Sequence, residues 1–96
     1  MIRSVGNRLA EDLFHERLTS RTRRFPGELR RAASNKLQYL NAAVSLGDLA
    51  VLPGNRLEAL KGDRHGCHAI RINDQWRIAF RWQREGVDAV EVTDYH

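Results

Sequence analysis

The chain ends in three residues that together could act on a phosphate ester. They are Asp94, Tyr95 and His96, which offer a carboxylate, a phenol and an imidazole able to exchange a proton near neutral pH. Chain ends commonly fray, so a disordered tail is the alternative interpretation. Asp94 directly follows a stretch rich in β-branched residues, and this favours a tail that is held in place.

Metal-free cleavage of RNA is a reaction that suits this set of residues. RNA carries its own nucleophile, the 2′-hydroxyl. A protein need only take that proton, protonate the leaving 5′ oxygen and hold cations at the phosphate. The candidates for proton transfer are His96, Asp94 and Glu58. The candidates for holding the phosphate are Arg77, Lys61 and Arg71. Tyr95 could stack on a base, and passive binding of nucleic acid or protein is the alternative.

Metal and cofactor chemistry are not expected. His65, Cys67 and His68 are spaced more tightly than standard zinc ligands, and no second pair of ligands accompanies them. The sequence also lacks a glycine-rich phosphate loop and a nucleophile elbow.

The charge of the chain indicates an anionic partner. The net charge is +4, and 14 of the 16 basic residues are arginine, whose planar guanidinium suits phosphate and carboxylate. The first 50 residues hold nine basic and five acidic side chains, whereas the remainder holds seven of each. The densest basic run, which we expect to bind RNA, comprises Arg21, Arg23, Arg24, Arg30 and Arg31. A solvated helix face is the alternative interpretation.

Composition also limits the compartment. Cys67 is the only cysteine in the sequence, so no internal disulfide is possible, and this favours a reducing environment. We find no apolar run of signal-peptide length and none near the roughly 20 residues that a membrane span needs. The sequence therefore predicts one cytoplasmic domain over residues 1–96 that does not associate with membranes.

Two amphipathic helices are predicted in the first half of the chain, after a short strand at residues 2–5. The first helix begins after Asn7, which is a suitable N-cap, and should end near Thr19. Residues 20–25 are polar and basic, so we expect a connection there. The second helix should begin at Pro26 and end near Gly47.

Alternating residues in the last third predict a β-hairpin and a third strand. Apolar and polar side chains alternate over residues 70–72 and 76–82, and Asn73 and Asp74, which both tolerate positive φ, should form the turn between them. Residues 87–93 form the next predicted strand, whose alternation puts Asp94 and His96 on the apolar face unless the strand ends or bulges first. The expected fold class is α+β, with the N-terminal strand and a helical hairpin packed on one face of a small, mainly antiparallel sheet. The other face should carry the arginines of the hairpin.

Three segments together resemble the HigB branch of the RelE/ParE toxin superfamily. They are Leu-Glu-Ala-Leu-Lys-Gly-Asp at 57–63, Ile-Arg-Ile-Asn-Asp-Gln-Trp-Arg-Ile at 70–78, and the terminal Asp-Tyr-His. The similarity is strong over residues 52–96 and looser over the helices. It implies a RelE-like fold and a ribosome-dependent endoribonuclease that cuts mRNA in the ribosomal A site and so inhibits translation and growth.

The same resemblance implies roles and partners. By motif match, Lys61 and Arg77 would stabilise charge at the phosphate, and Asp94, Tyr95 and His96 would be catalytic or would position the substrate. The implied partners are a HigA-like helix-turn-helix antitoxin, the 70S ribosome with mRNA, and operator DNA through the antitoxin. The polar open face favours a monomer when the toxin is free.

One residue departs from the family pattern, which has a histidine three residues before the lysine where this chain has Glu58. An ionised glutamate can accept a proton but cannot donate one. Three alternatives to the nuclease function stay open at this point: a ParE-like toxin that poisons DNA gyrase, a non-catalytic RNA-binding module, and a pure interaction protein.

Overall fold

The computed structural model describes residues 1–52 and 54–94. Helices fill the first half of the chain and strands fill the second, apart from two short 3-10 helices at Gly27–Leu29 and Gly62–Arg64. The helices are α1 (Arg8–Phe14), α2 (Ser20–Arg24), α3 (Arg30–Ala42) and α4 (Leu46–Ala50). The strands are β1 (Glu58–Ala59), β2 (His68–Arg71), β3 (Trp76–Gln83) and β4 (Gly86–Asp94). No helix in the described ranges is long and apolar enough to cross a membrane.

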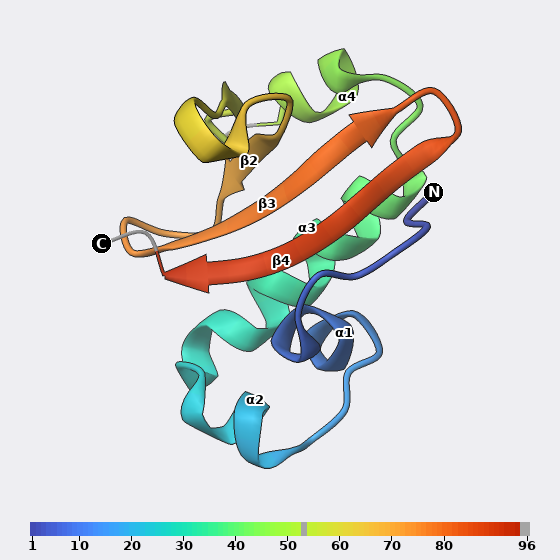
Figure 1. The fold of residues 1–96 in the computed structure, drawn as a ribbon. Coiled ribbons are helices and arrows are strands. Elements are labelled where there is room, and N and C mark those ends of the chain that lie inside the picture. The colour runs from blue at the N-terminus through green and yellow to red at the C-terminus, as the bar shows by residue number, and fades with distance from the viewer. Residues whose placement is uncertain (53, 95–96) are drawn as a thin grey trace.

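The fold is α+β, as expected from the sequence. Within the described residues, the strands form an antiparallel sheet in the order β1-β2-β3-β4, and α3 runs behind β3 and β4 (Figure 1). Helix α3 buries Leu37 and Leu40 against the sheet residues Ile70, Ile78 and Phe80. Because alternate residues of a strand face opposite sides, this packing leaves the other face of the sheet without a helix layer.

The N-terminal segment lies along β4 without forming a regular strand. Ile2 and Val5 make isolated parallel bridges to Val87 and Val90. Ser4 supports this contact, since its hydroxyl accepts a hydrogen bond of 2.8 Å from the backbone N–H of Ala89. The predicted strand at residues 2–5 is therefore reduced to two bridges, which cover the outer edge of β4.

The helices differ from the prediction at their ends. Helix α1 stops at Phe14, and Glu16 then takes a left-handed conformation with φ 55°, which a helix running to Thr19 would not allow. The predicted connection at residues 20–25 holds the short helix α2, capped by the side chain of Thr19. Helix α3 ends at Ala42, and Gly47 lies inside α4 instead of ending a helix.

The β2–β3 hairpin is present, but its loop is wider than a tight turn. Four residues, 72–75, separate the strands, and neither Asn73 nor Asp74 has a positive φ. The side-chain oxygen of Asn73 instead accepts hydrogen bonds from the backbone N–H groups of Gln75 (3.0 Å) and Trp76 (2.7 Å). The loop is thus shaped by an Asn side chain that takes the place of a backbone acceptor.

A β-bulge interrupts the pairing of β3 with β4. The step from Ala79 to Arg81 on β3 faces the step from Asp88 to Glu91 on β4, which is one residue longer. Ala89 absorbs the extra residue with φ 54°. Regular pairing resumes after the bulge and continues to the last described residue of the strand.

Candidate active site

Residues from all four strands meet on the open face of the sheet. Glu58, Ala69, Ala79 and Glu91 are successive partners across β1 to β4. In the next row, Arg71 is the partner of Arg77, and Arg77 is the partner of Thr93. Residues two apart on a strand share a face, so Glu58, Arg71 and Arg77 all lie on the side away from α3. This agrees with the prediction that the hairpin arginines occupy the free face.

Arg77 is held at the end of the hairpin. Its guanidinium donates to the carbonyl oxygen of Asn73 and, at 3.2 Å, to the carbonyl oxygen of Trp76. Arg71 forms an ion pair with Asp74 in the same loop. The β2–β3 loop therefore fixes both guanidinium groups, which gives the site two positioned cations next to each other.

Asp94 reaches the same loop from the end of β4. It is the partner of Trp76 in the regular pairing, so β4 does not end before it, and the bulge lies upstream. Asp94 consequently lies on the side of β4 that carries the apolar residues, as alternation predicted. It is nevertheless exposed, because it lies at the end of the strand. Its carboxylate accepts a hydrogen bond of 2.9 Å from the side-chain amide of Gln75. Tyr95 and His96, the other two terminal candidates, lie outside the described residues.

The segment that follows β1 in the sequence also contributes to the site. Lys61 is exposed and immediately precedes the 3-10 helix at Gly62–Arg64. Leu60 turns inward against Ala69 and Ala79, and Arg64 forms an ion pair of 2.9 Å with Glu91. The segment that carries Glu58 and Lys61 is thus packed onto the open face at the β1 edge.

The structure adds two supporting residues that the sequence did not single out. The half-buried amine of Lys36 donates to the side-chain oxygen of Asn55 and to the carbonyl oxygen of Arg71, both at 2.7 Å. The backbone N–H of Arg71 in turn donates to the carbonyl oxygen of Asn55 at 2.6 Å. Burial of the amine, followed by the charge of Arg71, lowers the pKa of Lys36. The available signal was position, because Lys36 lies on α3 between the buried residues Ala33 and Leu40.

The predicted basic run is divided among different environments. Arg21 forms an ion pair of 2.8 Å with the buried Asp12, whereas Arg23, Arg24 and Arg31 are exposed. Phe25, at the end of α2, packs edge-on against Trp76 with ring centroids 4.9 Å apart. The α2 arginines therefore lie on elements adjacent to the end of the sheet that carries Asp94.

No metal centre accompanies these groups in the part of the chain that the structure describes, since no three His, Cys, Asp or Glu side chains gather there. The chemistry available at the open face comes from carboxylates, guanidinium groups and one lysine amine. Such groups can bind a phosphate and move protons without a bound cofactor.

The sequence also matches known proteins. A family model described as the RelE-like toxin of type II toxin-antitoxin system HigB matches residues 9–96. Toxin HigB-1 of Vibrio cholerae is 40% identical over 75 residues, which cover 78% of this chain and 75% of that protein. Endoribonuclease HigB of Proteus vulgaris is 30% identical over the full length of both chains. With the RelE-like fold and the arginine-bearing open face, these matches show that the chain belongs to the HigB family of RelE-like toxins of type II toxin–antitoxin systems.

Proposed function

We propose that this toxin is a ribosome-dependent endoribonuclease that cuts mRNA in the A site. The observation that carries the proposal is the convergence of Arg71, Arg77 and Asp94 on the β2–β3 loop, at one end of an exposed sheet face. The relative from Proteus vulgaris is named an endoribonuclease, which supports the same reaction class.

Cleavage would proceed through the 2′-hydroxyl of the substrate. The 2′ oxygen attacks the phosphorus as its proton leaves, the bond from phosphorus to the 5′ oxygen breaks, and the 5′ oxygen takes up a proton. The products are a 2′,3′-cyclic phosphate and a 5′-hydroxyl. We assign the proton acceptor to a carboxylate, Glu58 or Asp94, and the proton donor to His96. Tyr95 would stack on a base and so orient the scissile bond.

Charge stabilisation falls to the cations of the open face. Negative charge builds on the phosphate during attack, and prepositioned cations stabilise this transition state more than they stabilise the bound substrate. Arg77 and Lys61 are assigned this role, with Arg71 beside them. Glu58 lies on the same open face as Arg77. It occupies the position at which the family pattern has a histidine, so this toxin would have a carboxylate there.

The proposed partners of the toxin are an antitoxin and the ribosome. An antitoxin follows from the family; we propose that it is a HigA-like helix-turn-helix protein that contacts operator DNA. The basic run of Arg21, Arg23, Arg24, Arg30 and Arg31 would contact RNA of the 70S ribosome. We further propose a cytoplasmic toxin that is monomeric when free.

Primer extension on a defined mRNA, in a reconstituted translation mixture with and without ribosomes, tests the proposed activity. We expect cuts within A-site codons only when ribosomes are present. Removing a cation that stabilises the transition state typically costs about 100-fold or more in rate, and we expect this loss for Arg77→Ala. Arg84→Ala, on an exposed arginine of the β3–β4 loop, is the matched control and should cleave normally.

Other outcomes of these assays would indicate a different function for the protein. Cleavage of naked RNA would indicate a general ribonuclease. Absence of cleavage together with inhibited DNA supercoiling would indicate a gyrase-poisoning toxin. Equal activity of Arg77→Ala and the wild type would contradict the catalytic role of the arginine.

A further inference from the structure

A pocket in the helical layer lies outside the site described above. It has a volume of about 440 Å³ and is bordered by α1, the segment after α1, α2 and α3. This volume falls in the range of roughly 300–1,000 Å³ that is typical of ligand sites. None of the residues assigned to catalysis lines the pocket, although Arg30 and Arg31 also belong to the basic run proposed to contact ribosomal RNA.

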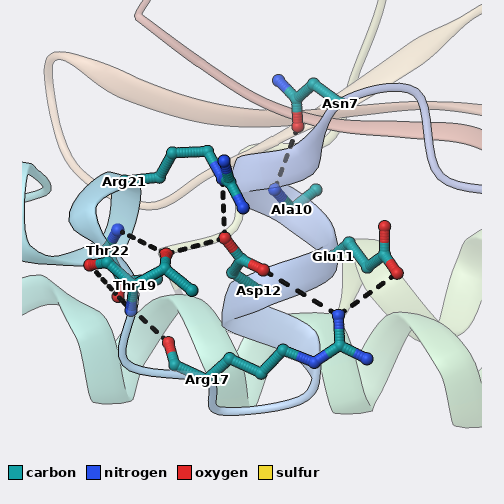
Figure 2. Close-up of polar contacts among 8 residues, drawn as sticks. All are labelled: Asn7, Ala10, Glu11, Asp12, Arg17, Thr19, Arg21 and Thr22. Atoms are coloured by element: carbon teal, nitrogen blue, oxygen red, sulfur yellow. Dashed lines mark hydrogen bonds and ion pairs between the residues drawn. The ribbon is translucent and has the colours of Figure 1, made fainter.

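A polar network connects α1 to α2, as Figure 2 shows, and three of its residues, Asp12, Arg17 and Thr22, also line the pocket. The carboxylate of Asp12, which is 3% exposed, accepts hydrogen bonds of 2.8 Å from the hydroxyl of Thr19 and from Nε of Arg21. The hydroxyl of Thr22, which is also buried, donates to the carbonyl oxygen of Arg17 at 3.0 Å. These contacts join α1 to α2 and fix the positions of Asp12 and Thr22 in the lining of the pocket.

The pocket keeps an excess of positive charge. Asp12 is neutralised by Arg21, and Arg17 pairs with Glu11 at 3.3 Å. The other charged lining residues are Glu16, Arg30 and Arg31. Within the described ranges, neither Arg30 nor Arg31 has an ion-pair partner, so both guanidinium groups at the start of α3 are available for carboxylates.

An apolar component accompanies this charge. Leu18 lines the pocket and is 70% exposed, while Leu13 lies buried in the wall. A leucine left this open gains from an apolar side chain that enters the cavity and covers it. The pocket thus combines one apolar subsite with two cations.

We propose that this pocket binds a segment of the antitoxin in which acidic residues flank one large apolar side chain. The apolar side chain would enter between Leu13 and Leu18, and the carboxylates would pair with Arg30 and Arg31. A ribonucleotide strand would use the cations but would leave Leu18 uncovered, so a peptide fits the two features together. The inference does not depend on the nuclease chemistry, because the pocket shares none of the residues assigned to that reaction.

Titration of purified toxin variants with the purified antitoxin tests the proposal. Arg30→Gln combined with Arg31→Gln removes both charges while keeping good helix formers. The variant loses the charge-assisted hydrogen bonds of both arginines, so we expect antitoxin binding roughly tenfold or more weaker. Arg23→Gln with Arg24→Gln is the matched control, since it removes equal charge from exposed positions on α2 outside the pocket and should leave the affinity unchanged.

A second variant tests the apolar subsite without touching charge. Leu18→Ser changes an exposed side chain, so the fold should survive, and antitoxin binding should weaken. Overlapping synthetic peptides that span the antitoxin serve as a further probe. We expect the wild-type toxin to retain peptides with acidic residues around a Leu, Ile or Phe, and the double Arg30/Arg31 variant to lose them.

Three results would overturn the proposal. If Arg23→Gln with Arg24→Gln weakened antitoxin binding as much as the Arg30/Arg31 variant, the effect would come from long-range charge and not from the pocket. Unchanged antitoxin affinity in both the double Arg30/Arg31 variant and Leu18→Ser would place the contact elsewhere. Weaker binding of a single-stranded RNA oligonucleotide by the Arg30/Arg31 variant, with unchanged antitoxin affinity, would make the pocket an RNA site.

Discussion

At the scale of single residues, Asp12 shows how one buried carboxylate can join two helices. It lies in α1, yet it accepts hydrogen bonds from Thr19 and Arg21, which precede and form α2. The hydrogen bond from Arg21, followed by that from Thr19, lowers the pKa of Asp12 below its ordinary value of 3.8. The ionised form is therefore the one that the folded state prefers.

This preference makes stability depend on pH. The folded pKa lies below the unfolded one, so the contribution of Asp12 is complete above the unfolded pKa and is lost as the pH falls through the folded pKa. Asp12→Asn should be less stable than the wild type at neutral pH. The gap should close as the pH falls below 3.8, because the wild type then loses the same charge.

Urea unfolding of both proteins across this pH range measures the effect. Glu28→Gln is the control, since it removes an exposed carboxylate from the 3-10 helix at Gly27–Leu29 and should follow the wild-type curve at every pH. Parallel curves for Asp12→Asn and the wild type would show that the carboxylate contributes nothing through its charge.

The site residues that strand alternation can place were predicted, and those that depend on loop shape were not. Alternation alone puts Arg71 and Arg77 on one face and Asp94 on the other. The hydrogen bond from Gln75 that ties Asp94 to the hairpin depends on a four-residue loop built around Asn73. Periodicity carries no information about such a loop, so its contacts became visible only in the structure.

At the scale of elements, the long helix and strands β2, β3 and β4 were predictable because they carry periodic apolar residues, whereas the two-residue strand β1 was not predicted. Helix α2, with the sequence Ser-Arg-Thr-Arg-Arg, has no apolar stripe. It is helical because the side chain of Thr19 caps its N-terminus and because Thr22 is buried against the rest of the protein. Helix α4 begins with a capping box formed by Ser45 and Asp48. That Ser-x-x-Asp pattern was a usable sequence signal for a helix start.

The bulge in β4 gives a prediction at this scale. Ala89 is exposed with φ 54°, a left-handed conformation that costs an alanine about 1–2 kcal/mol. Glycine avoids this strain but loses about 0.5–1 kcal/mol through the greater freedom of the unfolded chain. We therefore expect Ala89→Gly to raise the free energy of unfolding by up to about 1.5 kcal/mol.

Denaturant unfolding compares this variant with Ala59→Gly. Ala59 is also exposed but sits in the extended strand β1, so glycine there should lower stability by about 0.5–1 kcal/mol. Opposite signs at the two sites would establish strain at the bulge. A loss of stability at both sites would show that Ala89 is not strained in solution.

At the scale of the whole molecule, the sheet presents little edge to other chains. Residues 2–5 cover β4 on one side, and β1, on the other, is only two residues long. Blocked or short edges oppose strand-to-strand association, which agrees with the expectation of a monomer. The surfaces left for partners are the open sheet face, the α2 arginines and the pocket of the helical layer.

Variants of two arginine pairs within the basic run, Arg23 with Arg24 and Arg30 with Arg31, should distinguish ribosome binding from antitoxin binding. If Arg23 and Arg24 neutralise RNA phosphates, toxin–ribosome affinity must fall with salt, and each lost contact should reduce the slope of log affinity against log salt by about 0.7–0.9. We expect Arg23→Gln with Arg24→Gln to weaken ribosome binding at low salt, with a slope reduced by roughly 1.4–1.8.

Sedimentation of toxin with purified ribosomes over a range of monovalent salt, at fixed magnesium, measures this slope. The same variant is the one expected to bind antitoxin normally, so an effect on ribosomes alone cannot come from misfolding. An unchanged slope would exclude these side chains from the ribosome contact. Both double variants remove two charges from the same helical layer, so any difference between them must arise from where the charges lie. Arg23 and Arg24 are exposed on α2, whereas Arg30 and Arg31 line the pocket of the helical layer.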